Sequence, residues 1–202
     1  MRKYFIIVLF VIPVLLNAQT DISVGMGVNF ENASNLRDYV NFDILGTDKL
    51  STFNSSVEFF SEVAFPFAKN LQLGFEYAMS IYSVNAALGA SLYELSYNHH
   101  KPTAILYYLI QGEGYKLKFG GGIGFRYITL DEKIIKTTSY STTGFGFLLR
   151  AEAHTLLSKN LFALIAGDFR TDLPSDISKP DGKKIGLKSI GFGVKLGLSY
   201  NF

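Results

Sequence analysis

The sequence predicts an all-β protein: an eight-stranded antiparallel up-and-down transmembrane β-barrel with short periplasmic turns and longer extracellular loops. After residue 20, apolar residues alternate with polar or small ones through most of the chain, which is the period of a β-strand. Short polar turns recur near residues 69, 113 and 159, a spacing of roughly 44 residues that fits one long hairpin each. The alternation continues to Phe202, in the segment GFGVKLGLSYNF.

The N-terminal segment MRKYFIIVLFVIPVLLNAQT has the features of a secretory signal peptide. Arg2 and Lys3 precede an apolar stretch from residue 5 to residue 16, and Ala18 is a small residue suited to cleavage. We therefore expect residues 1–18 to be the signal peptide and residues 19–202 to form the barrel. A membrane-anchoring helix is the alternative, but it needs about 20 apolar residues.

The composition excludes several classes of function. The chain has no cysteine, which rules out disulfides, cysteine zinc ligands, a thiol nucleophile and lipid attachment through cysteine. Its formal net charge is only +2, so we expect no nucleic-acid partner.

The first four expected strands are Asp21–Phe30, Ser56–Phe67, Leu71–Tyr82 and Thr103–Gln111. The apolar face of the first consists of Ile22, Val24, Met26, Val28 and Phe30, and that of the second of Val57, Phe59, Val63 and Phe65. The third alternates most regularly, with Leu71, Leu73, Phe75, Tyr77, Met79 and Ile81 opposite Gln72, Gly74, Glu76, Ala78, Ser80 and Tyr82. Before the fourth, the segment 83–101 either belongs to a loop or extends the third and fourth strands above the membrane.

The last four expected strands are Tyr115–Thr129, Thr143–Leu156, Leu161–Arg170 and Ser189–Phe202. The fifth places Leu117, Phe119, Ile123, Phe125 and Tyr127 outward and Lys116, Lys118, Gly120, Gly122, Gly124 and Arg126 inward. The eighth places Phe192, Val194, Leu196, Leu198, Tyr200 and Phe202 on one face. Tight turns are expected at Ala68–Asn70, Gly112–Gly114 and Ser158–Asn160, and long polar loops at Glu31–Ser55, Ser83–Pro102, Leu130–Thr142 and Thr171–Lys188.

The physics of the bilayer explains this pattern. In lipid every backbone N–H and C=O must be paired within the protein, so a sheet spans a membrane only when it closes. The last strand must then pair with the first, which accounts for its order up to Phe202. Eight strands leave a narrow interior that side chains fill, and glycines on the inner face leave room for long charged neighbours. A soluble β-sandwich or lipocalin-like barrel has the same period and is the alternative.

The chain resembles the small outer-membrane β-barrel family of the OmpA/OmpX type, porin-like barrel domains of Gram-negative bacteria. The resemblance rests on the eight amphipathic strands, on the segment KNLQLGFEY after the first turn and on the terminal SYNF. It implies a bacterial outer-membrane location and an insertion signal at Tyr200 and Phe202 that the membrane insertion machinery reads. We expect no peptidoglycan-binding domain of the OmpA kind after Phe202.

Charged residues on inward positions form the main candidate site. They are Glu76, Arg126, Arg150, Glu152, His154, Asp168, Arg170 and Lys195, with Glu58 and Glu62 on the inner face of the second strand. Buried charges must be paired. We expect a salt-bridge network that plugs the barrel, and the alternative is a narrow polar pore or proton path.

The histidines are weak candidates for catalysis or metal binding. His154 lies beside carboxylates, as a general base does, but it lies close to a periplasmic turn and away from outer-leaflet lipid. His99 and His100 are expected in a loop or strand end, and adjacent strand residues point to opposite faces, which makes a poor chelating pair. We expect no catalytic residue, no metal site and no cofactor.

Two loops offer candidate contact surfaces. The fourth carries Lys179, Lys183, Lys184 and Lys188, which can contact lipopolysaccharide phosphates or simply be solvated. The first carries the apolar residues Tyr39, Phe42, Ile44 and Leu45, which either form a partner surface or fold back onto the barrel rim.

The sequence therefore predicts a non-enzymatic outer-membrane barrel with a structural or interaction role. Its loops or wall would bind lipopolysaccharide, another surface ligand or a larger membrane assembly. A narrow pore is the first alternative, and a lipid A-modifying enzyme is the second.

Overall fold

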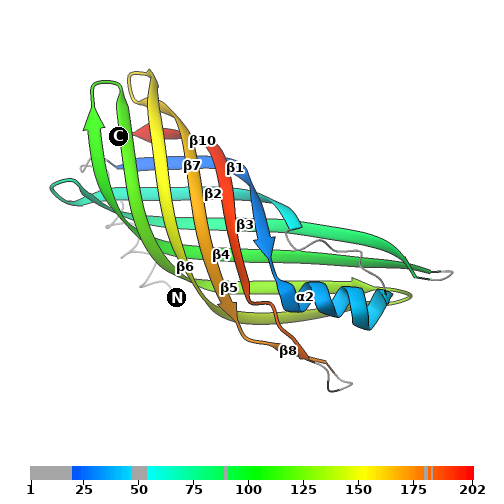
Figure 1. Ribbon diagram of the computed structural model, residues 1–202. Coiled ribbons are helices and arrows are strands. Elements are labelled where there is room, and N and C mark those ends of the chain that lie inside the picture. The colour runs from blue at the N-terminus through cyan, green and yellow to red at the C-terminus, as the bar shows by residue number, and fades with distance from the viewer. Residues whose placement is uncertain (1–19, 47–53, 89–90, 180–181, 183) are drawn as a thin grey trace, which may run out of the picture.

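The protein is a closed β-barrel, seen here in a computed structural model that describes residues 20–46, 54–88, 91–179, 182 and 184–202. The strand order around the barrel is β1-β10-β7-β6-β5-β4-β3-β2, all antiparallel (Figure 1). The strands are β1 Asp21–Asn32, β2 Asn54–Ala68, β3 Leu71–Leu88, β4 Ser91–Gly112, β5 Tyr115–Lys133, β6 Thr137–Ser158, β7 Leu161–Pro174 and β10 Ser189–Asn201. The predicted eight-stranded barrel is confirmed, and β10 closes it by pairing with β1 from Asn201↔Asp21 to Ile190↔Asn32.

One end of the barrel, which we call the turn end, carries three tight turns. They join β2 to β3 at residues 69–70, β4 to β5 at 113–114 and β6 to β7 at 159–160. Each contains a residue with positive φ: Asn70 at 61°, Gly114 at 77° and Lys159 at 27°. Left-handed conformations let two-residue turns follow the right-handed twist of the flanking strands. The three turns lie at the predicted positions.

The opposite end, which we call the loop end, carries the elements outside the barrel (Figure 1). These are the helix α2 Ser34–Asp38, the wider helical turn η1 Tyr39–Leu45, and the short hairpin of β8 Ile177–Ser178 and β9 Lys184–Ile185. Among the described residues, no helix has the length and hydropathy to cross a membrane.

Two of the four predicted long loops are wrong. β3 and β4 pair as far as Leu88↔Ser91, and β5 and β6 as far as Lys133↔Thr137. The segments 83–102 and 130–142 are therefore mostly strand among the described residues, and residues 134–136 join β5 to β6. This is the alternative in which segment 83–101 extends its strands. The polar residues that indicated loops are the outward face of strands that continue beyond the membrane.

The polarity of the two faces reverses along these long strands. On β3 the outward side chains are apolar up to Ile81 and become polar at Ser83 and Asn85. The inward side chains change the opposite way, from the buried Ser80 to Tyr82. The reversal marks where the surroundings of the sheet change from hydrocarbon to water.

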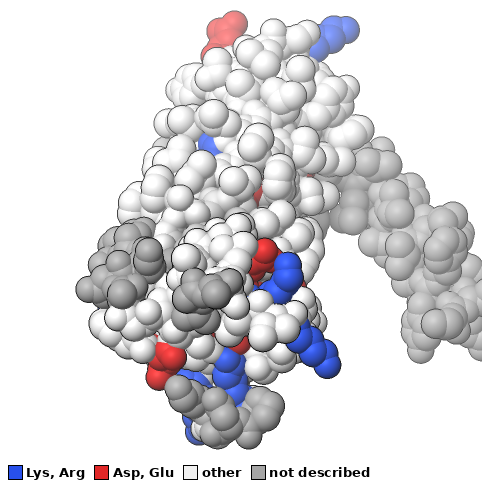
Figure 2. All heavy atoms as spheres, turned by 90° about the vertical axis from the view of Figure 1, so that its right-hand side faces the viewer, with Lys and Arg blue, Asp and Glu red and all other residues white. Residues whose placement is uncertain are grey.

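The membrane-spanning part presents an apolar wall. Figure 2, which faces the right-hand side of Figure 1, shows charged side chains gathered in the lower part of the molecule and a few at its top, with a largely uncharged wall between them. Large apolar side chains such as Phe75, Phe119, Phe147 and Leu196 point outward and remain about half exposed. This is the wall expected of a barrel immersed in lipid.

Above the membrane, the barrel contains a separate apolar core, which we call the cap. It consists of Leu36, Tyr39 and Val40 from α2–η1, Tyr93, Leu95 and Tyr97 from β4, Ile128 and Leu130 from β5, and Ile177, Ile185 and Leu187. Ile44 and Leu45 pack against it, whereas Phe42 stays 66% exposed. The apolar residues of the first loop, Phe42 excepted, therefore fold back onto the barrel rim.

Candidate functional site

The membrane-level interior of the barrel is a dense network of opposite charges. Among the described residues, seven buried cations lie there with seven buried carboxylates. The cations are Lys101, Lys116, Lys118, Arg126, Arg150, Arg170 and Lys195, and the carboxylates are Asp21, Glu58, Glu62, Glu76, Glu152, Asp168 and Asp172. Equal numbers keep the interior close to neutral, as burial away from water requires.

Arg150 is the centre of this network. Its Nη2 donates to Glu76 Oε2 at 2.5 Å, and its Nη1 donates to Glu62 Oε2 at 3.1 Å. Its Nε donates to Asp168 Oδ1 at 2.6 Å. Because Arg150 lies on β6 and both glutamates lie on β2 and β3, these bonds cross the lumen and fill it.

A second set of cations completes the crossing. Lys195 on β10 lies 2.6 Å from Glu58 and 3.0 Å from both Glu76 and Asp168. Arg170 on β7 donates to Glu76 Oε1 at 2.7 Å. Each carboxylate is therefore shared among several cations, an arrangement that ties together strands from opposite sides of the barrel.

Tyr107 is an interior residue that sequence analysis missed. From β4, its hydroxyl donates to Glu62 at 2.7 Å and lies 3.2 Å from Glu152 Oε1, its alternative acceptor. The ring packs over Gly120, where an added Cβ would meet it. An inward tyrosine in an otherwise apolar strand gives little sequence signal, because its outward neighbour Tyr108 is also a tyrosine.

Near the turn end, Asp21 holds a further missed cluster. It pairs with Lys116 at 2.8 Å and Lys118 at 2.9 Å, and it accepts hydrogen bonds from Gln72 at 3.1 Å and Asn201 at 2.7 Å. These contacts join β1 to β3, β5 and β10, and so lock the closing seam.

His154 belongs to the interior network. Its Nε2 lies 3.0 Å from Glu152 Oε2, and its side chain is buried. Glu152 is also within hydrogen-bond distance of Arg150 and of the Tyr107 hydroxyl. The imidazole of His154 therefore extends the charge network towards the turn end. Its position near the turn after Ser158 is where the sequence places it.

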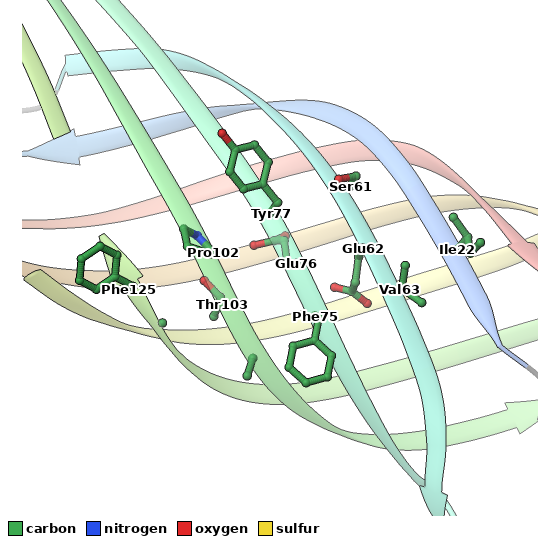
Figure 3. A pocket seen from close by; sticks show the side chains of 12 residues that line it. Ile22, Ser61, Glu62, Val63, Phe75, Glu76, Tyr77, Pro102, Thr103 and Phe125 are labelled. Atoms are coloured by element: carbon green, nitrogen blue, oxygen red, sulfur yellow. The ribbon is translucent and has the colours of Figure 1, made fainter. Parts of the chain in front are cut away.

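The outer wall is hollowed between β2, β3, β4 and β5 (Figure 3). This hollow has a volume of about 500 Å³. Its floor includes the small outward residues Ser61, Pro102 and Ala104, and Phe75 and Phe125 stand at its sides. We refer to it as the wall hollow.

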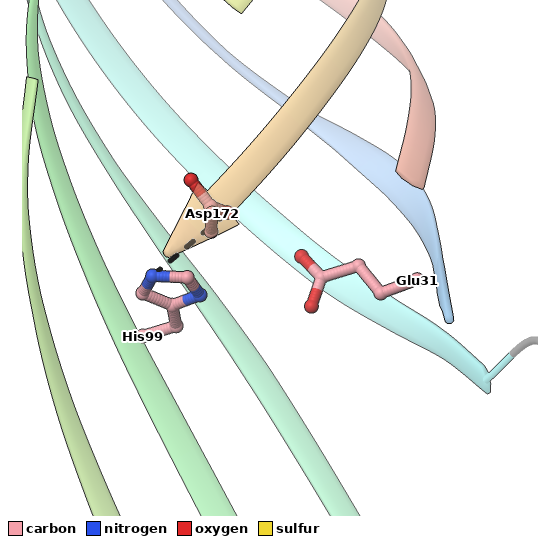
Figure 4. Close-up of side chains that lie close together, drawn as sticks. All are labelled: Glu31, His99 and Asp172. Atoms are coloured by element: carbon pink, nitrogen blue, oxygen red, sulfur yellow. Dashed lines mark ion pairs between the residues drawn. The ribbon is translucent and has the colours of Figure 1, made fainter. Parts of the chain in front are cut away.

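A polar cluster lies inside the barrel at the loop-end side of the charge network, next to the cap (Figure 4). Ligand atoms of Glu31, His99 and Asp172 lie within 4.8 Å of one another, close enough in principle for a metal ion. However, Glu31 pairs with Lys101 at 2.6 Å, and Asp172 pairs with Arg126. These two cations already neutralise the carboxylates and would repel a bound metal.

The histidine pair lies within β4 and not in a loop, which corrects the sequence interpretation. His99 points inward and is fully buried, whereas His100 lies on the outer face beside Tyr77 and Tyr127. The two imidazoles therefore lie on opposite sides of the wall, as strand geometry predicts.

Lys179 is engaged within the cap. Its Nζ donates to Glu132 at 2.6 Å and to the Tyr39 hydroxyl, and it lies over the rings of Tyr39 and Tyr140 at 4.5 and 5.3 Å. Glu132 also accepts from the Tyr93 hydroxyl at 3.0 Å. Burial and the Glu132 carboxylate raise the pKa of Tyr93, so this hydroxyl remains a donor at physiological pH.

The other predicted lysines differ from Lys179. Lys184 and Lys188 are exposed, and Lys183 lies outside the described residues. Tyr200 lies on the outer wall with its ring against Phe202, at a centroid distance of 4.9 Å.

Comparison with known proteins identifies the fold. No family model and no curated protein sequence matches the chain. Among solved structures, Ail, the attachment invasion locus protein of Yersinia pestis, is 16% identical, with a TM-score of 0.58 over 92% of this chain and 99% of that chain. Neisserial surface protein A is 10% identical, with a TM-score of 0.56 over 91% and 97%. The outer membrane protease OmpT from Escherichia coli is 11% identical, with a TM-score of 0.51 over 91% and 96%.

The chain thus has the fold of the small outer-membrane barrels of the OmpA/OmpX type, as the sequence predicts. Its closed antiparallel sheet and apolar wall are the structure that spans a bacterial outer membrane, and this is where the protein resides. In such barrels the short turns face the periplasm, so the loop end and its cap face outward.

Proposed function

We propose that the protein is a non-enzymatic outer-membrane barrel with a structural or interaction role, acting through its loop end and its wall. The observation that carries this proposal is the filled lumen. Arg150, Tyr107 and Lys195 each bond to carboxylates on other strands, which leaves the interior occupied by side chains. A barrel of this kind presents surfaces and does not conduct solutes.

The loop end supports an interaction role. The outward face of β3–β6 above the membrane has a hollow of about 410 Å³ lined mainly by Ser83, Asn85, Glu94, Ser96, Asp131, Lys133 and Thr137. These hydroxyl, amide and charged groups suit a polar surface ligand. The neighbour Ail has been solved with the heparin analogue sucrose octasulfate, which makes a polyanionic ligand worth testing here.

We further propose that Lys184 and Lys188 contact phosphates of lipopolysaccharide, since both are exposed at the outward end. Lys179 is not part of this proposal, because Glu132 and Tyr39 already hold it. Insertion into the membrane through Tyr200 and Phe202, read by the insertion machinery, remains part of the proposal, as does association with a larger membrane assembly.

The experiment is a conductance measurement on the folded barrel in planar bilayers, combined with mass spectrometry of lipid A from expressing cells. We expect silent traces and unchanged lipid A. Single-channel steps that change in Arg126→Gln or Glu152→Gln would instead establish the pore. Modified lipid A that reverts in His154→Ala would instead establish an enzyme. The protease OmpT shows that a similar barrel can carry enzymatic activity.

A further inference from the structure

The wall hollow is a place where the lipid-facing surface is deeper than its surroundings. Many outward positions in the membrane carry bulky apolar side chains, but Pro102 and Ala104 are consecutive small outward residues on β4, and Ser61 is a third small residue on β2, on the far side of Tyr77. Pro102 has no N–H, and the β4–β5 pairing is interrupted at Lys101 and Pro102. The result is an apolar recess of about 500 Å³ that hydrocarbon must fill.

A polar trio lies at the outward end of this recess, on the same strands. His100 lies on the outer face of β4, two residues before Pro102, and its Nδ1 is 2.6 Å from the Tyr77 hydroxyl. The Tyr77 side chain itself lines the recess (Figure 3). On the other side, the His100 and Tyr127 rings lie 5.9 Å apart.

On β4 and β5 the trio lies at the outward boundary of the apolar wall, whereas on β3 the outward side chains stay apolar up to Ile81, which pairs with Asn98. The next outward residue on β4 is Asn98, and the next on β5 is Thr129, both polar. Towards the turn end the corresponding neighbours are Pro102 and Phe125. The trio therefore lies at the level of the headgroups of the outer leaflet, and the recess extends from it into the acyl region.

The hydrogen bonding of the trio makes it a donor site. When the Tyr77 hydroxyl donates to Nδ1, the His100 ring proton is on Nε2, which can donate to an oxygen outside the barrel. The Tyr127 hydroxyl adds a second donor, since this side chain is 40% exposed. Phosphate oxygens accept such bonds strongly.

We propose that the wall hollow and the trio Tyr77–His100–Tyr127 together bind one phosphorylated glycolipid of the outer leaflet, of the lipopolysaccharide class. One acyl chain lies in the recess over Ala104 and Pro102, and a headgroup phosphate accepts from His100. This site deepens the proposed role of the wall, and it is distinct from the lysines of the fourth loop.

The chain contains a matched control surface. A second outer-wall hollow of about 400 Å³ is lined by Gly121, Gly122, Phe147, Leu148, Leu149, Phe169 and Thr171, without a histidine or tyrosine. A Cβ added at Gly121 would make only ordinary van der Waals contacts, since its nearest atoms would be 3.7 and 3.9 Å away. This second hollow offers acyl-chain space, and the Thr171 hydroxyl is the one side-chain donor among its lining residues.

The test is native mass spectrometry of the purified, folded barrel with bis-phosphorylated lipid A as the probe and dioleoylphosphatidylglycerol as the competitor. We expect a single lipid A to stay bound to the wild type. Ala104→Leu fills the recess and His100→Ala removes the donor, and each should weaken retention by about tenfold, the factor for one charge-assisted hydrogen bond or two methylenes. The control Gly121→Leu should retain lipid A like the wild type.

Equal retention by all four proteins would overturn the proposal, as would equal binding of the competitor, which would mean an unspecific acyl groove. His100→Ala adds no bulk to the wall and removes only the exposed contacts of the imidazole with Tyr77 and Tyr127, so it decides the outcome if Ala104→Leu does not fold. Gel mobility of unheated samples reports folding. A negative result in this test would not affect the two results expected for the proposed function, which are silent conductance traces and unmodified lipid A. Failure of this inference is therefore separable from failure of the proposed function.

Discussion

The membrane-spanning part of the barrel and its extension above the membrane use the same strands with opposite polarity. In the membrane-spanning part, the interior holds Arg150 and Glu76, and the outer face carries Phe75 and Phe119. In the extension above the membrane, the interior holds Leu95 and Leu130, and the outer face of the same strands is mainly polar. The comparison shows that the medium around the sheet decides which face is apolar. Apolar side chains are favoured where the outer face contacts hydrocarbon, and polar side chains are favoured where it contacts water.

The two regions are consequently stabilised by different forces. The stability of the membrane-spanning interior depends on paired charges. Their mutual attraction offsets the cost of their desolvation only while every partner is present. The cap depends on buried apolar area, worth about 25 cal/mol per Å², together with one polar link at Lys179. Substitutions of one type should therefore have different consequences in the two regions.

The largest effect is expected from breaking the charge network. Arg150→Met leaves Glu62, Glu76 and Asp168 without their main partner, and removal of one member of a buried pair costs about 3–5 kcal/mol. Urea unfolding in detergent micelles, followed by gel mobility of unheated samples, measures the loss. The exposed cation Lys188 offers the control, and Lys188→Met should unfold like the wild type. A wild-type midpoint for Arg150→Met would show that the network does not stabilise the barrel.

A cavity in the cap should act locally. Leu95 is 1% exposed, and Leu95→Ala should cost about 2–4 kcal/mol in the free energy that protects α2 and η1. Hydrogen exchange followed by mass spectrometry should show faster exchange in residues 34–45 with unchanged protection of the membrane strands. Leu92→Ala, on the outer face of the same strand, is the control. Loss of protection throughout the barrel would mean that cap and barrel unfold as one unit.

The polarity reversal can be tested with one charge at two heights. Leu106→Lys places an ammonium on the lipid face, where it costs about 2–3 kcal/mol, whereas Ser96→Lys places it on the outward face above the membrane, where about 0.5 kcal/mol or less is expected. Both positions lie on the outer face of β4. Folding yield and urea midpoint in phospholipid vesicles compare them. Equal effects would contradict the membrane boundary drawn near His100.

The smallest effect is expected at the link across the cap. Lys179→Met removes the bonds to Glu132 and Tyr39, and we expect a loss of about 1–2 kcal/mol in local protection of residues 34–45. Limited proteolysis rates of α2 and η1 provide the measurement. Lys184→Met is the control, because Lys184 is exposed. Unchanged rates in Lys179→Met would show that apolar packing alone holds the cap.

The candidate site was partly accessible from the sequence. Inward positions such as Arg150, Glu152, Asp168 and Lys195 follow from the strand period, because every second residue shares a face. Their partners do not follow, since a bond such as Arg150–Glu76 depends on which strands lie across the lumen. Tyr107 and Asp21 were missed for the same reason. The sequence groups Lys179 with the surface lysines of the fourth loop, because nothing local to it indicates Glu132.

The sequence by itself determined the barrel, its eight strands, the three tight turns and the apolar wall, because each depends on local alternation and turn chemistry. Only the tertiary structure decided where the membrane ends along β3–β6, that α2 and η1 cover a second core, and that the wall is recessed over Ala104 beside His100. The reason is physical. The two-residue period of a strand shows which residues share a face. The medium on that face and the partners across the lumen are set by strands that are distant in sequence.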